Sequence, residues 1–356
     1  PRKFKPTISG CQIGCTIPEV NDLSFLAVRT DRGIGFATLV GGGAGAPPML
    51  ARPLGAVVWP NDVFDVAVAI VEIFRDHGKR ESKAKARFKW LVAEWGVQKV
   101  RASIEDKIGK RLDDYSINGT IQTGGEHIGI QPQKQDGEFY VNVPVVGGNI
   151  TNKQLMRISE LSERYGTGEL RLTTSQNIIV INVRQESLFN IKEELKGIGE
   201  SVEAPPMRWT TIACAGNFCG KAPESPKQRM KMILAQLEDE FGESLNGLNL
   251  RLALSGCPNA CGRHVAADIG LQAVKVKVDG GFDIGYDVFL RQVNGDYTSL
   301  AKLVRKGILA SEVADTVRKI ISTYIASKVG SESFGEFCGR HTKEELVALL
   351  RSGSGD

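Results

Sequence analysis

The sequence lacks a long apolar segment and a secretory signal. Its most apolar stretch, VAVAIVEIF from Val66, runs into charged residues and is much too short to span a bilayer. The chain begins PRKFKPT without a methionine, which predicts a fragment or a trimmed start. These absences favour a cytoplasmic protein that has no membrane partner.

The sequence also lacks a strong excess of charge. Lysine and arginine number 45 against 41 aspartate and glutamate residues, and the formal net charge of +4 is too small to indicate a nucleic-acid partner. Hydrophobic residues make up 42% and charged residues 24%, as in soluble globular proteins. A length of 356 residues exceeds what one hydrophobic core usually organises, so we expect two or three domains.

A convincing nucleotide-binding fingerprint is missing as well. GGGAGAPP, from Gly41, follows a predicted strand, but no third glycine stands at the required position and Pro47-Pro48 stands where a helix would open. The glycines predict either a close approach of the backbone to some other ligand or a plain turn. The sequence therefore gives no sign of a bound flavin or nicotinamide.

Hydrophobic periodicity predicts an α+β protein in three segments. Residues 1–113 contain short strands before residue 40 and two helices, DVFDVAVAIVEIFRDHG and ESKAKARFKWLVAEWG. Residues 114–205 begin with a polar linker and continue as strand, helix, strand and helix, which is typical of a small ferredoxin-like unit. Residues 206–356 hold the helix PKQRMKMILAQLEDEFG, further strands and a helical tail.

A run of basic residues precedes and enters the second of these helices. A solvated helix face is one explanation, and a docking patch for an acidic partner is the other. The run comprises Lys79, Arg80, Lys83, Lys85, Arg87 and Lys89.

One stretch of the chain occurs twice. SGCQIGCTIPEVNDLSFLAV, from Ser9, aligns without a gap with SGCPNACGRHVAADIGLQAV, from Ser255. Each copy has two cysteines separated by three residues, then an aspartate (Asp22 or Asp268) and a predicted strand. The wide separation excludes a solenoid and predicts two duplicated halves, of which the first is incomplete.

Cysteines are few but clustered. The seven cysteines form close pairs with one left over, Cys338, which favours metal ligation over disulfides. Four thiolates from two loops are able to hold an iron–sulfur cluster or a structural zinc ion, and the spacing alone leaves both open. Buried, unligated cysteines are the third alternative. The four candidate ligands are Cys214, Cys219, Cys257 and Cys261.

The cysteine motifs belong to a wider set that resembles a known family. PRKFK, CAGNFCG and SGCPNACGR, with ELRLTTSQN between the first two, resemble the siroheme- and [4Fe-4S]-containing nitrite/sulfite reductases of the ferredoxin-dependent type. GGGAG, HIGIQPQKQDG and SESFGEF add to a likeness that covers nearly the whole chain in the family's order, with the N-terminal part lacking.

The resemblance implies an architecture of pseudo-duplicated siroheme-domain halves with a ferredoxin-like unit between them. Residues 1–113 are then the rear part of the first half, 114–205 the ferredoxin-like unit, and 206–356 the second half with the [4Fe-4S] motif. It also implies that the family's first ferredoxin-like unit and the arginines that complete the substrate pocket lie outside this chain.

The resemblance assigns the metal chemistry to the second copy of the repeat. All four candidate cysteines become cluster ligands, and Cys261 becomes the thiolate that bridges the cluster to the siroheme iron. Asn259, between two of these cysteines, is expected to pack near the cluster and the macrocycle. The first copy is then a relic, because no cysteine pair precedes it in this chain.

The resemblance also gives the basic start of the chain a role. Arg2, Lys3 and Lys5 supply cations for the carboxylates of siroheme, while Lys3 and Lys5 bind the anionic substrate and help to protonate its oxygens. CAGNFCG resembles the nitrite-reducing branch of the family, whereas Lys5 in PRKFK resembles the sulfite-reducing branch.

The activity implied is the multi-electron reduction of sulfite to sulfide or nitrite to ammonium, with ferredoxin or a similar small protein as donor. A non-catalytic cofactor-binding or electron-transfer fragment is the alternative, and a zinc-stabilised structural protein is a third. Two features depart from the family pattern. Four residues instead of five separate Cys214 from Cys219, and Arg291-Gln292 replaces a Gly-Gly pair, which predicts crowding at the site.

Overall fold

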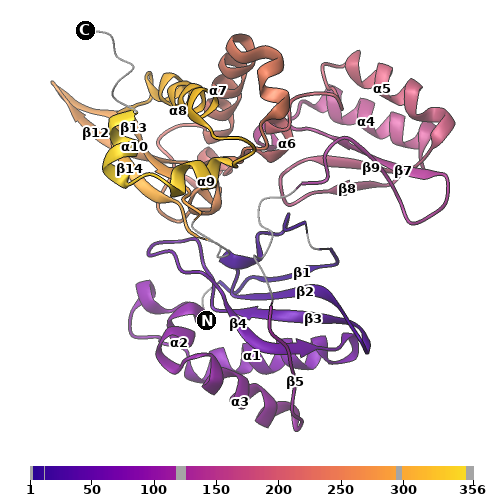
Figure 1. Ribbon diagram of the computed structural model, residues 1–356, viewed down its shortest axis with the longest axis vertical. Helices are drawn as coiled ribbons and strands as arrows, with labels where there is room; N and C mark the ends of the chain where they lie inside the picture. The colour runs from indigo at the N-terminus through magenta and orange to yellow at the C-terminus, as the bar shows by residue number, and fades with distance from the viewer. Residues whose placement is uncertain (1–2, 12, 118–125, 294–298, 350–356) are drawn as a thin grey trace. The chain divides into compact units, whose positions relative to one another are not determined.

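The computed structural model describes residues 3–11, 13–117, 126–293 and 299–349. It divides the chain into two compact units, which are taken separately below (Figure 1). The first unit comprises Pro1–Gly125 with Val293–Leu300, and the second comprises Glu126–Gln292 with Ala301–Asp356. Both units combine helices and sheets, so the predicted α+β class is confirmed.

The first unit is a five-stranded sheet with helices on one face (Figure 1). The strands lie in chain order, the first pair parallel and the others antiparallel. The longest helix turns one apolar stripe to the sheet, since its buried residues recur at intervals of three and four. The elements are β1 (Pro6–Ser9), β2 (Leu23–Thr30), β3 (Gly33–Val40), β4 (Arg52–Val58), α1 (Val63–His77), α2 (Phe88–Trp95), α3 (Val97–Ile108) and β5 (Asp113–Asp114).

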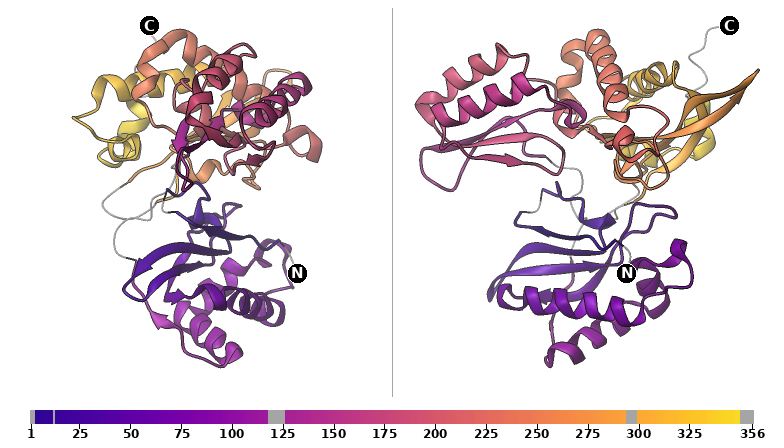
Figure 2. Two further views of the ribbon diagram at one scale, coloured as in Figure 1. Left: turned by 90° about the vertical axis from the view of Figure 1, so that its right-hand side faces the viewer. Right: turned by 180° about the vertical axis from the view of Figure 1, so that it is seen from behind.

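The second unit begins with a four-stranded antiparallel sheet in the order β6-β7-β9-β8. Figure 2 shows both long helices of this part on one face of the sheet. The first of them starts at a capping box, in which Thr151 and Gln154 each bond the other's backbone N–H. The elements are β6 (Ile130–Pro132), β7 (Glu138–Val143), α4 (Asn152–Tyr165), β8 (Leu170–Leu172), β9 (Ile178–Arg184) and α5 (Leu188–Lys196).

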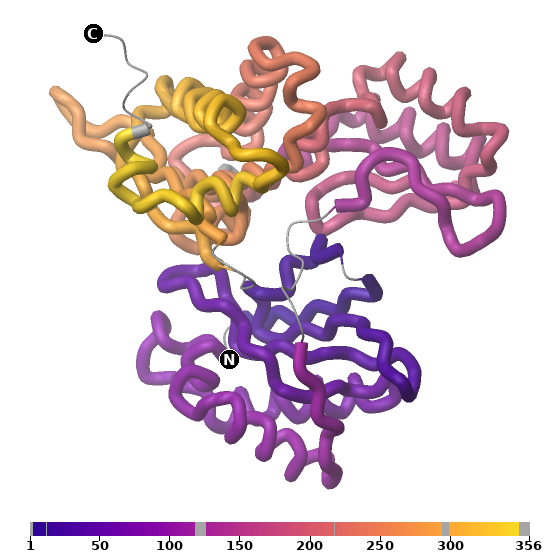
Figure 3. The backbone as a smooth tube through the Cα atoms, viewed as in Figure 1, coloured from indigo at the N-terminus to yellow at the C-terminus, as the bar shows by residue number. Residues whose placement is uncertain are grey.

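The rest of the second unit is another five-stranded sheet, again in chain order. The C-terminal helices lie against it and share one buried core with it (Figure 3). The elements are α6 (Met207–Thr210), β10 (Ile212–Ala213), α7 (Pro226–Phe241), β11 (Leu252–Ser255), β12 (Ile269–Val278), β13 (Gly281–Leu290), β14 (Lys302–Leu309), α8 (Val313–Ser327), α9 (Phe334–Gly339) and α10 (Lys343–Leu349).

The predicted repeat is present in the strand register. In the first unit Pro6 lies opposite Leu23 in the parallel pair β1–β2, and in the second Leu252 lies opposite Ile269 in the parallel pair β11–β12. These are the positions that the cysteine alignment equates. An antiparallel strand follows in each unit. The duplication therefore extends from sequence to topology.

The aspartate of each copy has the same task. The Asp22 carboxylate accepts the backbone N–H of Lys5 at 2.9 Å, and the Asp268 carboxylate accepts that of Arg251 at 2.8 Å. Each bond closes the loop that carries the cysteines onto the start of its strand pair. This explains why an aspartate stands at the end of both copies.

The two cysteine loops share a backbone conformation. Positive φ angles occur at Gly14 (74°) and Ala260 (54°), and again three residues later at Ile17 (49°) and Arg263 (60°). A single 3-10 turn follows each loop, Pro18–Val20 or His264–Ala266. A left-handed conformation is unfavourable for a β-branched residue such as Ile17, so the surrounding packing must hold this loop in place.

The basic run is not a continuous solvated face. Lys83 and Lys85 are exposed, but Arg87 bonds the buried carboxylate of Asp22 at 2.6 Å. Lys89 is 3% exposed, and its Nζ donates to the backbone oxygens of Gly45 and Pro47. Its burial lowers its pKa to about 8. The solvated-face hypothesis is therefore wrong for Arg87 and Lys89. Arg87 pairs with a buried carboxylate, and Lys89 supplies the donor that the carbonyls of the glycine loop need.

The glycine loop is explained by close backbone packing. No helix follows it before residue 60 among the described elements, which argues against a dinucleotide-binding turn. A Cβ on Gly42 would lie 2.6 Å from the oxygen of Asn21 and 2.7 Å from that of Glu19. The loop therefore lies directly on the turn that follows the first cysteine pair. Within the described ranges, no helix has both the length and the apolar character needed to cross a bilayer.

A half-buried carboxyl group, that of Glu200, gives the second unit a pH-dependent stability. Burial raises the pKa of Glu200 to about 7, an effect that the charges of Arg208 and Lys231 partly offset. Because the folded state then holds a proton that the unfolded state loses near pH 4.5, the free energy of unfolding falls as pH rises from about 4.5 to about 7. Above that range it stays level.

Replacing Glu200 by glutamine is expected to remove this fall. The variant should match the parent protein at pH 5 and be more stable by about 2 kcal/mol at pH 8, measured by denaturant unfolding. Glu203→Gln is the matched control, because Lys192 lowers the pKa of that exposed carboxylate. The prediction is contradicted if the free energy of unfolding changes between pH 5 and pH 8 by the same amount in the parent protein and in the Glu200→Gln variant.

Candidate metal centre

The loop that carries Cys214 and Cys219, the first cysteine loop of this site, follows the short strand β10. The backbone N–H of Cys214 donates to the oxygen of Leu254 at 3.1 Å, which extends the β10–β11 pairing by one residue. The chain then forms a 3-10 turn over Gly216–Cys219. Gly216 has a φ of +59°, and a Cβ there would lie 2.0 Å from Cδ of Pro226. The loop is thus packed tightly against the first turn of α7.

The second loop follows the neighbouring strand β11. The backbone N–H of Gly256 donates to Sγ of Cys214 at 3.1 Å, and the hydroxyl of Ser255 accepts the N–H of Gly262 at 3.1 Å. A Cβ on Gly256 would lie 2.3 Å from Cβ of Ala222. Small residues at both contacts let the two loops approach each other closely.

The structure brings three of the predicted ligands into one electrostatic environment. Burial raises the pKa of the Cys214 thiol, and the charges of Cys261 and Cys257 raise it further, while the N–H groups of Gly256 and Gly216 lower it. Cys219 lies at the end of the turn that follows Cys214, and its exposed thiol donates to the oxygen of Gly216 at 3.0 Å. The four candidate thiols thus lie on two neighbouring loops, three of them in electrostatic contact and Cys219 on the same turn as Cys214.

This donor set fits an iron–sulfur cluster. In the part of the chain that the structure describes, no three His, Cys, Asp or Glu side chains converge as ligands of a single ion. A [4Fe-4S] cluster takes four thiolates, one on each of four different irons, so its ligands stand further apart than those of one ion. Thiolates are the ligating form, so binding at Cys214 requires the loss of a proton that burial otherwise retains.

A turn of the ferredoxin-like sheet holds the first loop, a role that the sequence reasoning missed. The Gln176 side chain accepts the N–H of Ala213 at 3.1 Å and donates to its oxygen at 2.9 Å, as a paired strand would. Asn177 donates to the oxygen of Trp209 at 2.9 Å, and Arg263 donates to the oxygen of Thr174 at 2.7 Å. The TTSQN motif was the available signal, and nothing in its spacing revealed this contact.

The remaining predicted site residues lie in different places. Arg2 is outside the described residues. The ring of Phe4 packs against Phe74 and Phe88, with centroids 6.0 and 5.7 Å away. Of its neighbours, Lys3 is exposed, and Lys5 is half-buried and donates its backbone N–H to Asp22. These lysines belong to the first unit, whereas Asn259, exposed between the cysteines, belongs to the second.

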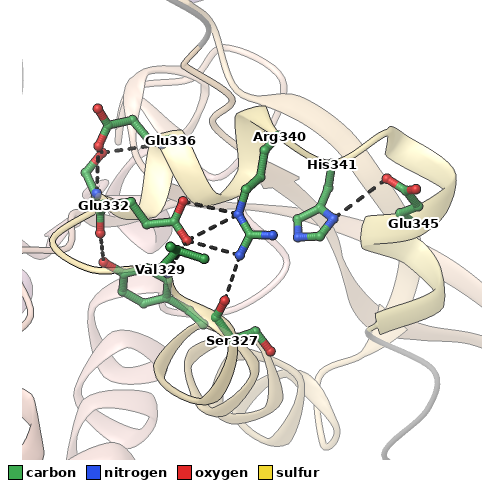
Figure 4. Close-up of polar contacts among 9 residues, drawn as sticks. Ser327, Val329, Glu332, Glu336, Arg340, His341 and Glu345 are labelled. Carbon is green, nitrogen blue, oxygen red and sulfur yellow. Dashed lines mark hydrogen bonds and ion pairs between the residues drawn. The ribbon is translucent and has the colours of Figure 1, made fainter.

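Arg291 and Gln292 are both buried. The Gln292 amide donates to the backbone oxygens of Cys338 and His341, at 3.1 and 2.9 Å. Figure 4 shows the adjoining network, in which Arg340 bonds the Glu332 carboxylate and the oxygen of Ser327. The Gln292 side chain thus anchors the C-terminal helices, a task that glycine would leave unfilled.

Two family descriptions match the chain. "Nitrite and sulphite reductase 4Fe-4S domain" matches residues 1–112 and 205–352, and "Nitrite/Sulfite reductase ferredoxin-like half domain" matches residues 131–198. The first match includes both copies of the repeat and all four candidate cysteines. The second falls on the sheet that supplies Gln176.

The relatives that this chain matches are named either as nitrite reductases or as sulfite reductases. An assimilatory ferredoxin-dependent nitrite reductase of Haloferax mediterranei is 30% identical, and the match covers 95% of this chain and 61% of that protein. A ferredoxin–nitrite reductase of Synechococcus elongatus is 33% identical, with 90% and 63% covered. A ferredoxin-dependent sulfite reductase of Mycobacterium tuberculosis is 29% identical, with 97% and 63% covered. The chain thus spans less than two thirds of the length of these relatives.

Solved structures agree with the fold. The NirA protein of Mycobacterium tuberculosis superimposes with a TM-score of 0.89 at 28% identity, over 97% of this chain and 64% of that protein. A dissimilatory sulfite reductase, DsrI, shares only the fold, with a TM-score of 0.50 at 13% identity. The family matches and the similarity to the named relatives show that the chain belongs to the nitrite and sulfite reductase family, whose members carry siroheme and a [4Fe-4S] cluster.

Proposed function

We propose that this chain is part of a ferredoxin-dependent reductase that converts sulfite to sulfide or nitrite to ammonium. The single observation that supports the proposal is the pair of neighbouring loops after β10 and β11, which carry the four candidate cysteines in a chain of this family. In this proposal Cys214, Cys219, Cys257 and Cys261 would hold the cluster, and Cys261 would be the thiolate that it shares with siroheme.

The division of the chain follows the same proposal. Residues 1–113 form the rear part of the first siroheme-domain half, 114–205 the ferredoxin-like unit and 206–356 the second half. The repeated strand register on either side of the ferredoxin-like sheet supports this order. The strand β5 (Asp113–Asp114) pairs with β4, which supports a boundary at this strand, within one residue of the proposed position. We place the enzyme in the cytoplasm, where thiols stay reduced.

In the proposed reaction the protein's own side chains attract the substrate anion and donate protons to it. Bound siroheme, coupled to the cluster, supplies single electrons to the substrate anion. In our proposal the Nζ groups of Lys3 and Lys5 attract that anion and donate protons to its oxygens as they leave as water. Arg2 pairs with carboxylates of the macrocycle, and Asn259 packs beside it.

Sulfite is our preferred substrate. Sulfite is largely a dianion near neutral pH and nitrite a monoanion, so a second ammonium in a water-poor pocket favours sulfite. Nitrite is the second candidate, because CAGNFCG resembles the nitrite-reducing branch. The cluster loop has less direct influence on the anion than a lysine that touches it.

Anaerobic purification tests the proposed function. The expected preparation contains iron and labile sulfide, shows siroheme absorbance and reduces sulfite or nitrite with reduced ferredoxin, supplemented if necessary with the N-terminal portion of a relative. Stoichiometric zinc without labile sulfide would instead establish the zinc-stabilised structural protein. A bound cluster and siroheme without turnover in the supplemented enzyme would favour the electron-transfer alternative.

Replacing Lys5 by asparagine tests the substrate preference. We expect kcat/KM for sulfite to fall by about tenfold more than kcat/KM for nitrite, because only the extra charge of sulfite depends on that ammonium. Lys5→Arg keeps the charge and should preserve the preference. Equal losses for both anions would make Lys5 a ligand of siroheme carboxylates or a general proton donor, and the preference for sulfite would lose its basis.

A further inference from the structure

Lys227 stands at the second position of α7 and is half-buried. Its Nζ donates to the backbone oxygens of Gly147 and Gly148, at 2.7 Å in both cases. Two acceptors on one nitrogen suit an ammonium group, which has three N–H donors and no acceptor. The flexible lysine side chain is therefore held in one place by the ferredoxin-like part of the second unit.

Lys227 lies beside the first cysteine loop. Pro226, the preceding residue, packs on Gly216 within the loop, and a Cβ on Gly147 would lie 3.4 Å from Cβ of Ala213 and 3.6 Å from Cα of Lys227. The Gly147 turn therefore touches both the lysine backbone and the residue before Cys214. The Lys227 ammonium and the Cys214 thiol interact electrostatically across this contact.

A fixed positive charge at this position has a defined effect on a bound cluster. Reduction adds one negative charge to the cluster, and a nearby cation in a partly desolvated setting stabilises the more negative state. The positive end of the α7 dipole acts in the same direction, because the helix begins at the same contact. The expected result is a higher reduction potential and easier acceptance of an electron from the donor.

We propose that Lys227 is a positioning residue for electron transfer, whose ammonium, fixed by the Gly147 and Gly148 carbonyls, raises the reduction potential of the cluster at the Cys214 loop. This inference rests on the cluster of the proposed function. It adds a residue outside the thiolate set, contributed by the helix that the first cysteine loop packs against. The Gly147–Gly148 turn then couples the ferredoxin-like part to the electronic properties of the cluster.

The test is an EPR-monitored redox titration of the anaerobically purified protein. Lys227→Met removes the charge and both donors, Lys227→Gln removes the charge but keeps N–H donors, and Lys227→Arg keeps the charge. Lys231→Met is the matched control, since it removes a charge one turn further along α7, about 6 Å away along the helix axis. The titration reports the cluster potential, which a purely structural role would leave unchanged.

We expect the methionine and glutamine variants to have about a tenfold less favourable equilibrium for one-electron reduction, which is about 59 mV lower in potential. The arginine variant and the Lys231→Met control should stay close to the parent protein. A potential in Lys227→Gln that equals that of the control would overturn the inference, as would equal potentials for the arginine and glutamine variants. If Lys227→Met fails to assemble a cluster, the comparison of cluster potentials between Lys227→Gln and Lys227→Arg still tests the role of the charge.

The same titration separates this inference from the proposed function. A parent protein without any cluster signal would overturn both. A parent protein with the cluster and with turnover, in which every Lys227 variant keeps the parent potential, would overturn only the tuning role.

Discussion

Cys257→Ser is expected to abolish the visible absorbance of the iron–sulfur cluster, whereas Cys11→Ser should leave it intact. The two cysteines occupy equivalent positions in loops that share strand register, positive φ angles and a closing aspartate. Loop conformation alone therefore predicts no difference between them. The difference arises from the strand beside each loop.

In the second unit β10 lies next to β11 and carries the other two cysteines. In the first unit β1 is the edge of the sheet among the described strands, and no second cysteine pair lies beside it there. Cys11 and Cys15 thus share the loop conformation of Cys257 and Cys261, but the described strands place no second cysteine pair next to them. Gly256, whose N–H reaches Cys214, has its counterpart in Gly10, which faces no such thiol within the described residues.

The measurement is iron, labile sulfide and visible absorbance per chain, after anaerobic purification of both variants. Complete loss in Cys257→Ser with parent-like values in Cys11→Ser is the expected outcome. Equal loss in both would show that the first copy takes part in metal binding. Equal retention would show that Cys257 is dispensable and would refute the four-thiolate ligand set.

The sequence was sufficient for those features in which a local pattern determines the structure. The cysteine spacing and the aspartates at the same offset predicted the duplicated strand–loop–strand unit, because such a unit is defined by residues close together in the chain. The apolar spacing predicted α1 and α7 for the same reason.

The features that the sequence did not reveal depend on contacts between distant segments. Lys89 reads as a solvated helix residue until the folded chain places it under the glycine loop, more than forty residues earlier. Gln176 reads as part of one continuous strand, whereas the structure places it in the turn between β8 and β9, where its side chain bonds Ala213 of β10. In both cases a side chain satisfies backbone groups of another segment, and hydrophobic periodicity carries no information about such bonds.

The loop that carries Cys11 and Cys15 is also expected to be essential for the stability of the first unit. Asp22 is fully buried and receives the Lys5 N–H at 2.9 Å and the Arg87 guanidinium at 2.6 Å, and Arg87 is itself only 16% exposed. Removing one partner of a buried ion pair leaves the other charge uncompensated in a poorly solvated site. Asp22→Ala should therefore lower the free energy of unfolding by about 3 kcal/mol or more.

Asp268→Ala is the matched control for this prediction. Its carboxylate is only half-buried and closes the equivalent loop through the Arg251 N–H, so its loss should cost about 1–2 kcal/mol. Denaturant unfolding followed by tryptophan fluorescence distinguishes the units, because Trp59, Trp90 and Trp95 lie in the first and Trp209 in the second. Similar losses for the two variants would mean that Asp22 contributes only its loop-closing hydrogen bond.

A double variant tests the ion-pair explanation directly. Adding Arg87→Met to Asp22→Ala should recover part of the lost stability, because it removes the cation that the first substitution leaves uncompensated. Failure of the double variant to recover any stability would refute the ion-pair explanation.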